Sequence, residues 1–204
     1  MTATFAPYAS AARSFAELVH RIPADAWDGP GLGDWDLRSL VGHTSRSLVT
    51  VSTYLQTTAE REDVTSPHGY YERVTAAALG IDPEAVLERG RQAGRDLGDD
   101  PADAVDGLVE RVFRDLDGVD DRLIEVIGGL GIRLYTYLPT RTFELAVHSL
   151  DIAGALGISL ELPDDVLADA VALASRIAVA SGHGPAVLLA LTGRTGLPPS
   201  FSVV

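Results

Sequence analysis

Cysteine is missing from this sequence of 204 residues. Its absence argues against disulfide bonds, a metal site built from thiolates and a cysteine nucleophile. A thiol that acts in this protein must therefore come from another molecule. Aromatic residues are also few, at 6%, and alanine, leucine and valine supply most of the apolar content. Because alanine and leucine favour helices and sheet sandwiches are richer in aromatic residues, this composition favours a helical protein.

Basic residues are scarce, with 16 Lys and Arg against 29 Asp and Glu and a net charge of −13. This balance argues against nucleic acid and against an anionic membrane surface as partners. Long hydrophobic runs are missing too, since stretches such as 186–191 are far shorter than a membrane span. The N-terminus lacks the basic start and apolar run of a signal peptide. We therefore expect a cytoplasmic protein.

The apolar residues that are present recur at helical spacing along most of the chain. Asp36, with Ser39 three positions later, and the run Asp82-Pro83-Glu84 are typical helix starts, and Gly157 is a typical stop. Pro139 either kinks its helix or marks its true start. Helices are predicted over 4–21, 37–60, 83–97, 102–116, 134–156, 163–180 and 185–191, with a further short one around 70–79.

The remaining segments are predicted to be loops, apart from 123–133, which reads as a short strand or an irregular connection. Residues 28–34 and 61–70 carry glycine and proline and are predicted to be loops. The length fits one domain. We predict an all-α helical bundle over residues 1–160, followed by a C-terminal helical extension and tail over 161–204.

One helical turn carries the strongest chemical signal. Glu144 and His148 are four residues apart, so both project from one face of the predicted helix and can bind one divalent metal. His43, at the edge of the apolar stripe of another helix, is the candidate third ligand. Two histidines and one glutamate suit zinc, and less selectively nickel, iron or cobalt. The alternative is a Glu144–His148 salt bridge half exposed at the bundle surface, with His43 a satisfied histidine at the shoulder of its helix and no metal.

Arg141 and Asp151 extend the polar row of Glu144 and His148 at spacings of three and four. Asp151 is a candidate to orient the imidazole of His148, and Arg141 is a candidate to steady an anionic substrate. The alternatives are a solvated helix charge for Asp151 and an ion pair with an acid for Arg141.

The other histidines are poorer candidates for the site. His20 lies near the end of the first helix, His68 lies in a polar segment, and His183 lies in a Ser-Gly-His-Gly turn. The sequence has no Gly-x-Ser-x-Gly elbow and no P-loop. Gly31-Leu32-Gly33 lacks the strand before it and the setting that a dinucleotide site needs.

Two stretches, GLGDWDLRSLVGHTSRSL and TRTFELAVHSLDIAGALG, resemble the two signatures of mycothiol-dependent maleylpyruvate isomerase-like proteins, within the DinB-like metal-binding superfamily. The ending LLALTGRTGLPPSFSVV is similar to the tail of many members. The resemblance implies a DinB-like four-helix bundle and a metal triad at His43, Glu144 and His148. It also implies a divalent metal, usually zinc, and a low-molecular-weight thiol as cosubstrate.

The sequence departs from the isomerase in two places. Residues 163–204 predict only short helices and coil, where the isomerase has a large separate domain that contributes to its substrate pocket. Thr44 stands where the family often has an apolar residue. The resemblance therefore implies the bundle and the triad rather than the maleylpyruvate reaction.

These observations predict a metal-dependent enzyme in which mycothiol or a similar thiol attacks a small electrophile, as a transferase or an isomerase. Two alternatives stay open at this point. One is a non-catalytic DinB-like binding or dimerisation protein, and the other is a metal-dependent hydrolase. A homodimer is compatible with each of these hypotheses.

Overall fold

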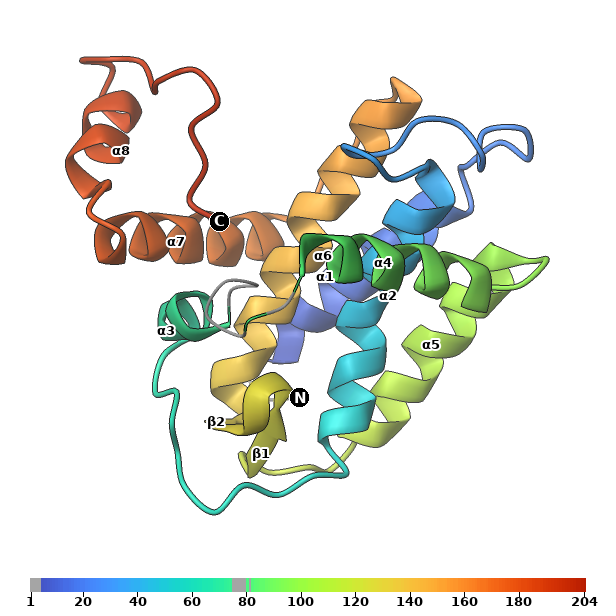
Figure 1. Cartoon of the computed structure of the whole chain (residues 1–204), viewed down its shortest axis with the longest axis horizontal. Helices are drawn as coiled ribbons and strands as arrows, with labels where there is room; N and C mark the ends of the chain where they lie inside the picture. Colours follow the sequence, from blue (N-terminus) through green and yellow to red (C-terminus); the bar gives the residue numbers. More distant parts are fainter. Residues whose placement is uncertain (1–4, 75–79, 81) are drawn as a thin grey trace.

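The computed structural model describes residues 5–74, 80 and 82–204. Within this part of the chain the fold is helical, with one added hairpin (Figure 1). The helices are α1 (Phe5–Val19), α2 (Leu37–Tyr54), α3 (Pro67–Arg73), α4 (Pro83–Asp96), α5 (Pro101–Leu116), α6 (Leu134–Leu156), α7 (Asp164–Ala180) and α8 (Gly184–Leu191). The antiparallel strands β1 (Leu123–Val126) and β2 (Leu130–Arg133) are joined by a short 3-10 turn, η1 (Ile127–Gly129).

Four of these helices form the bundle. Helix α1 packs on α5 and α6, and α2 packs on the same two helices, which closes a ring around one apolar core. The predicted all-α four-helix bundle is therefore confirmed. Its largest fully buried side chains come mainly from α1, α2 and α6, and they include Tyr8, Phe15, Leu40, Leu48, Tyr137, Leu138 and Leu145.

Helix α4 crosses α2 at very short range, and two glycines make this crossing possible. A Cβ atom on Gly42 would lie 2.1 Å from the backbone nitrogen of Gly94, and one on Gly94 would lie 2.8 Å from the Arg38 carbonyl oxygen. Neither distance allows a side chain. The contact fixes α4 against α2, next to the helix turn that carries His43.

The predicted helix boundaries are mostly confirmed. Asp36 caps α2 by accepting a hydrogen bond from the Ser39 backbone N–H at 2.7 Å, and Asp82 caps α4 by accepting from Glu84 N–H at 3.0 Å. Gly157 ends α6 in the left-handed conformation, with φ of 66°. Pro139 lies inside α6 and does not start it.

Two boundaries differ from the prediction. Helix α2 ends at Tyr54 and does not reach residue 60, because Thr57 turns away and bonds to both the Tyr54 and Glu125 carbonyl oxygens. Residues 67–70, predicted as loop, belong to α3, which Ser66 caps and Pro67 begins. Proline at a first helical position is favourable, so it marks a helix start here rather than a break. The predicted helix around 70–79 lies partly outside the described residues.

The C-terminal extension consists of α7, α8 and a returning tail. Helix α7 packs against α1, α3 and α6, whereas α8 packs against α7 and contains no buried residue. In Figure 1 the chain end lies beside α7, and Val203 packs against the core. Because α7 shares the bundle's core, the division into 1–160 and 161–204 stays a prediction. Across the described ranges, no helix has the length and apolarity that a bilayer crossing requires.

Candidate metal centre

Three side chains from two helices meet beside the crossing of α2 and α4. His43 projects from α2, and Glu144 and His148 project from successive turns of α6. Their candidate ligand atoms all lie within 4.8 Å of one another. The His148 Nε2 atom is 3.3 Å from Glu144 Oε2, and the two imidazole centroids are 5.0 Å apart. The structure thus brings together the three residues predicted to bind metal.

Both triad residues on α6 also make a polar contact with a residue outside the triad. Asp151 Oδ2 lies 3.0 Å from His148 Nδ1, so the imidazole presents Nε2 to the other two residues. This is the contact that the spacing predicted for Asp151. The Tyr71 hydroxyl, from α3, donates to Glu144 Oε1 at 2.9 Å. Such outer contacts fix the orientation of metal ligands and strengthen their binding.

His43 is positioned by an aromatic side chain. The ring of Trp35 packs on it with centroids 4.4 Å apart, and Trp35 Nε1 donates to the Leu87 carbonyl oxygen at 3.0 Å. Gly90 makes room for this tryptophan, because a Cβ there would lie 2.6 Å from its ring. Helix α4 therefore fixes the position of Trp35, and Trp35 in turn packs on His43.

The charges of the triad suit a cation. Burial, aided by nearby His148, lowers the pKa of His43 to about 4, so its imidazole is neutral near pH 7. Burial acts to raise the pKa of Glu144, but His148, Arg141 and Tyr71 together lower it to about 2. Burial acts to lower the pKa of His148, but Asp151 and Glu144 raise it to about 9. The metal-free centre thus holds a proton that a metal would displace.

Arg141 lies near the triad without pairing to it. Its guanidinium lies over the rings of Tyr70 and Tyr137, at 5.2 Å and 4.9 Å from their centroids, and Nε donates to Thr140 Oγ1 at 3.0 Å. Among the described residues it forms no ion pair with an acid. Its predicted role toward an anionic substrate stays a prediction.

The donor set fits a zinc-like ion. Ligand atoms of a tetrahedral zinc site, at about 2.0–2.2 Å from the metal, stand about 3.4 Å apart. The His148–Glu144 separation of 3.3 Å already matches that spacing, and none of the separations within the triad exceeds 4.8 Å. Two imidazole nitrogens and one carboxylate would leave coordination positions open, as in catalytic sites.

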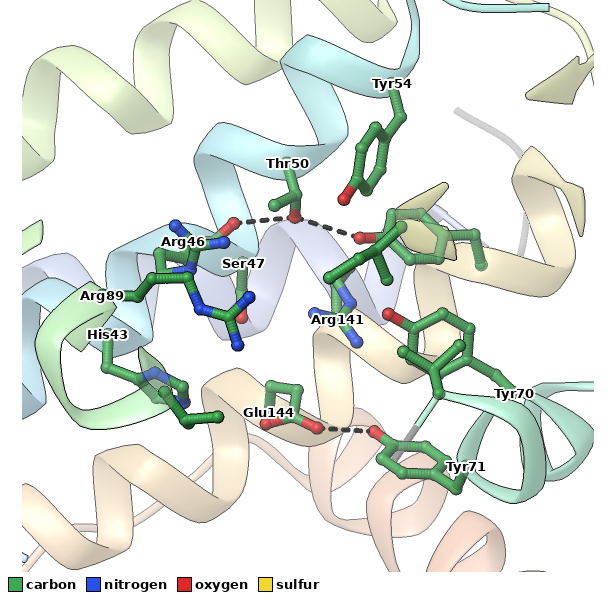
Figure 2. Close-up of a pocket in the computed structure, with 14 residues that line it drawn as sticks. His43, Arg46, Ser47, Thr50, Tyr54, Tyr70, Tyr71, Arg89, Arg141 and Glu144 are labelled. Carbon is green, nitrogen blue, oxygen red and sulfur yellow. Dashed lines mark hydrogen bonds between the residues drawn. The ribbon is translucent and has the colours of Figure 1, made fainter. Parts of the chain in front are cut away.

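Two cavities reach Glu144. The smaller, of about 200 Å³, lies between α2, α4 and α6, and His43, Arg46, Arg89 and Arg141 are among the residues that line it (Figure 2). The larger, of about 700 Å³, lies toward the C-terminal extension. Both cavities have Tyr71 and Glu144 in their walls, whereas His43 lines the smaller cavity alone and His148 is not among the described lining residues of either.

The other histidines lie outside the triad. His20 Nε2 contacts Asp106 Oδ2 at 2.8 Å and joins α1 to α5. His68 belongs to α3, and its Nδ1 atom is buried without a hydrogen-bond partner among the described residues. The His183 ring packs on Phe201, with centroids 5.5 Å apart.

Sequence reasoning missed several residues that build the site. Arg46 was detectable, because it follows His43 by three positions on the same helix. Trp35 lies within the first signature stretch but carried no assigned role. Tyr71 and Arg89 reach the site from α3 and α4 through tertiary packing, and no local pattern marks them.

Comparison with known families identifies the chain. The family model described as "Mycothiol maleylpyruvate isomerase N-terminal domain" matches residues 8–153, which is well over half of the sequence. The chain therefore belongs to this family, and its bundle is DinB-like. The match spans all three triad residues and ends before α7. Comparisons with the curated proteins and with the solved structures give no significant match.

Proposed function

We propose that this protein is a metal-dependent enzyme that uses a low-molecular-weight thiol, mycothiol or a similar one, on a small electrophile. The reaction is either transfer of the thiol sulfur to the electrophile or thiol-assisted isomerisation. The observation that supports this most is the convergence of His43, Glu144 and His148, with two cavities that each reach Glu144. Membership in a mycothiol-related family supports the choice of thiol.

In this proposal His43, Glu144 and His148 hold a divalent metal, with zinc the best match to the donors. The metal supplies Lewis acidity, which lowers the pKa of a bound thiol so that the sulfur is nucleophilic near neutral pH. Asp151 keeps His148 turned toward the site, and Tyr71 keeps Glu144 in place. The absence of cysteine leaves the external thiol as the sulfur nucleophile.

The two cavities suit two reactants of different size. The larger is walled by apolar side chains from α4, α7 and the tail, including Val86, Ile177 and Val203, and its volume of about 700 Å³ fits a sugar-linked thiol. The smaller, of about 200 Å³, has room for a short molecule. We therefore assign the thiol to the larger cavity and the electrophile to the smaller one.

Elemental analysis of tag-free protein tests the metal. We expect about one divalent ion per chain, and loss of that ion in His148→Ala, because the remaining pair cannot complete the site. His183→Ala is the matched control, since His183 packs on Phe201 away from the triad, and it should keep its metal. Full occupancy in His148→Ala would contradict the site assignment.

Thermal unfolding with mycothiol tests the thiol. A ligand that binds only the folded state raises the apparent stability. We expect mycothiol to raise the melting temperature of the metal-loaded protein and to have a much smaller effect on His148→Ala. Metal binding without protection by any thiol would favour the hydrolase hypothesis, and absence of both would favour a non-catalytic binding module.

A further inference from the structure

Most of the large apolar side chains that this chain leaves exposed lie near its C-terminal end. Eleven such side chains are exposed in the described part of the chain, and seven of them lie within 171–204. Three of the seven, Val179, Leu188 and Leu191, are 68%, 63% and 68% exposed. Neighbouring exposed apolar groups on a folded protein mark a surface that another molecule covers.

Helix α8 is the main part of this exposed region. It consists only of glycine, proline, alanine, valine and leucine, so it has no polar side chain on any face. It packs against α7, and none of its residues is buried. A helix that is apolar all round is normally enclosed on every side, and eight residues alone form a helix of little stability in water. Packing within one chain therefore leaves α8 without the cover that its composition requires.

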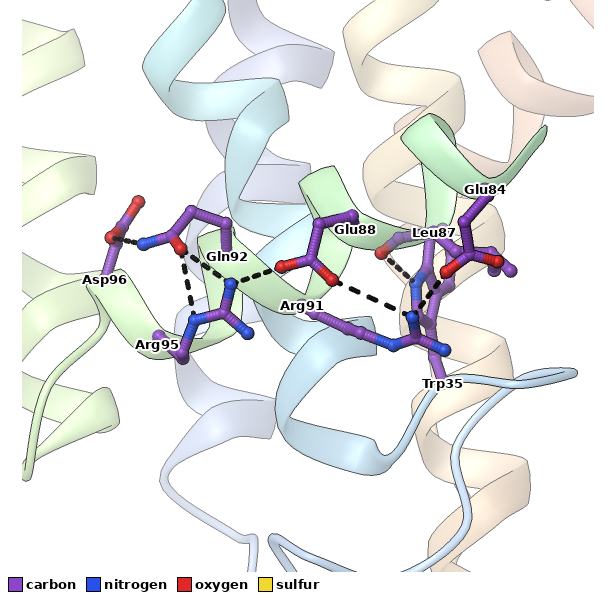
Figure 3. Close-up of polar contacts among 8 residues, drawn as sticks. All are labelled: Trp35, Glu84, Leu87, Glu88, Arg91, Gln92, Arg95 and Asp96. Atoms are coloured by element: carbon purple, nitrogen blue, oxygen red, sulfur yellow. Dashed lines mark hydrogen bonds and ion pairs between the residues drawn. The ribbon is translucent and has the colours of Figure 1, made fainter. Parts of the chain in front are cut away.

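Helix α4 shows how this chain builds a helix face that meets water. On its outer face Arg91 pairs with Glu84 at 2.9 Å (Figure 3). On the same face Arg95 pairs with Glu88. Helix α8 has no side chain that could form such a pair. The contrast indicates that the surface of α8 is suited to a protein contact rather than to solvent.

Helix α8 and the end of α7 form one continuous surface. A Cβ atom on Gly184 would lie 3.0 Å from Val179 Cγ2, so the start of α8 lies directly against Val179. Figure 1 shows α8 and the tail at the end of α7 that is farther from the bundle. We name the exposed side chains of Val179, Leu188, Leu189 and Leu191 the terminal apolar surface.

The distribution of charge favours a second copy of this chain as the molecule that covers the surface. All 29 acidic residues precede position 170, and Arg176 and Arg194 are the charged side chains of 170–204. Two copies that each carry −13 repel one another, and the repulsion is weakest where their acid-free segments meet. The centres of protein interfaces are likewise poor in charged residues. The same net charge disfavours an anionic membrane as the occupant.

We propose that the terminal apolar surface is the contact of a homodimer, in which α8 of one copy packs on α8 of the other about a twofold axis. Such a contact presents the same apolar side chains from both copies. The segment 170–204 exposes more than twenty residues, and one side of a standard interface of about 800 Å² holds about 20–30. The dimer requires neither a metal nor a thiol, so its test is independent of the proposed function.

Sedimentation equilibrium of the full chain over a range of concentrations tests the dimer. We expect the mass to rise from that of one 21.6 kDa chain to twice that value and no further, because a twofold contact closes on itself. Leu191→Glu should weaken the association about tenfold or more, because it places a carboxylate from each copy in an apolar contact. Added salt should strengthen the wild-type association, because it screens the repulsion between the acidic bundles.

Leu32→Glu is the matched control, because it makes the same change at an exposed leucine in the loop before α2, and it should associate as the wild type does. Leu188→Glu provides the same test if Leu191→Glu fails to fold. A monomer at every concentration, undiminished association in Leu191→Glu, or an equal loss in Leu32→Glu would overturn the proposal. In dilute protein the two copies separate, and Leu188 and Leu191 are then exposed as they are in the single chain.

The lack of cysteine allows a direct test of where the two copies meet, because one introduced cysteine is the only thiol in the chain. Thr195→Cys places a spin label beside α8, since the Thr195 N–H bonds to the Leu189 carbonyl oxygen at 3.4 Å. Thr53→Cys places one on α2. We expect stronger dipolar coupling between the two copies for labels at 195 than for labels at 53. The reverse order would overturn the proposal, as would a monomer that binds vesicles of neutral lipid, which would assign the surface to a membrane.

Discussion

The bundle and the last helix of the C-terminal extension, α8, use apolar residues in opposite ways. In the bundle, Leu48 and Leu145 are fully buried, whereas Leu188 on α8 is 63% exposed. The family match covers the bundle and the triad but not α7 or α8. The extension nevertheless supplies Ile177 and Val203 to the wall of the larger cavity. The residues that would hold the metal thus lie within the family match, and part of the wall beside them lies outside it.

The largest expected effect concerns the burial of leucine side chains, which differs between the bundle and α8. Leu48→Ala removes a fully buried side chain from the bundle, and we expect a loss of about 2–5 kcal/mol in the free energy of unfolding. The same change at the exposed Leu188 should cost within about 0.5 kcal/mol. Urea unfolding of both variants in dilute protein, where the chain is a monomer, measures the difference. Equal losses would mean that α8 is packed as firmly as the bundle.

Asp151→Asn should have the next largest effect, on metal affinity. Asp151 contacts the Nδ1 atom of His148 and so orients its imidazole. Removal of such a contact to a metal ligand lowers metal affinity about 10–100-fold. Competition with a chelator measures the affinity. Asp99→Asn, a change of an exposed acid outside the site, is the control, and a loss as large in that variant would assign the effect to net charge.

The pH dependence of metal binding follows from the triad alone and should not need the extension. Near pH 7, His43 (pKa about 4) is neutral, Glu144 (about 2) is ionised and His148 (about 9) is protonated. Metal uptake should therefore release about one proton, and affinity should rise about tenfold per pH unit up to about pH 9. Calorimetry in buffers of different ionisation enthalpy counts the proton. Uptake with no proton released would contradict this charge state.

The smallest effect concerns a surface contact within the bundle. Asp106 raises the pKa of His20, so the pair adds stability below the unfolded value of about 6.5, and this is lost as pH rises through the folded pKa. The effect should be small, because the side chains are 49% and 45% exposed. Thermal unfolding of His20→Ala should differ slightly from wild type at pH 5.5 and much less in alkaline buffer. A difference that grows with pH would contradict the assignment.

Much of the bundle could be predicted because its signals are local. Capping at Asp36, the Asp82-Pro83-Glu84 start and the Gly157 stop depend on neighbours within a few residues, and the structure confirms all three. The Glu144–His148 pair also depends on one helical turn. The proximity of His43 could be expected because it lies at the edge of an apolar stripe that packs on α6.

The rest depends on packing between distant segments. Tyr71 reaches Glu144 across 73 positions, and Arg89 arrives on a helix whose placement depends on the contact between Gly42 and Gly94. The early end of α2 depends on Thr57 bonding to the hairpin strand β1. The start of α3 was a different error, because Pro67 can equally end or begin a helix and only the Ser66 cap decides between them.

The glycine crossing also sets which positions are open to redesign. Any side chain at position 42 or 94 would push α4 away from α2. This movement would displace Arg89 and would also remove the contact of α4 with Trp35. A mutant library that varied these glycines would therefore consist mostly of misfolded variants. Libraries restricted to Val86 and Arg89, which line the smaller cavity on the same helix, would vary the shape and charge of that cavity while both glycines stay in place.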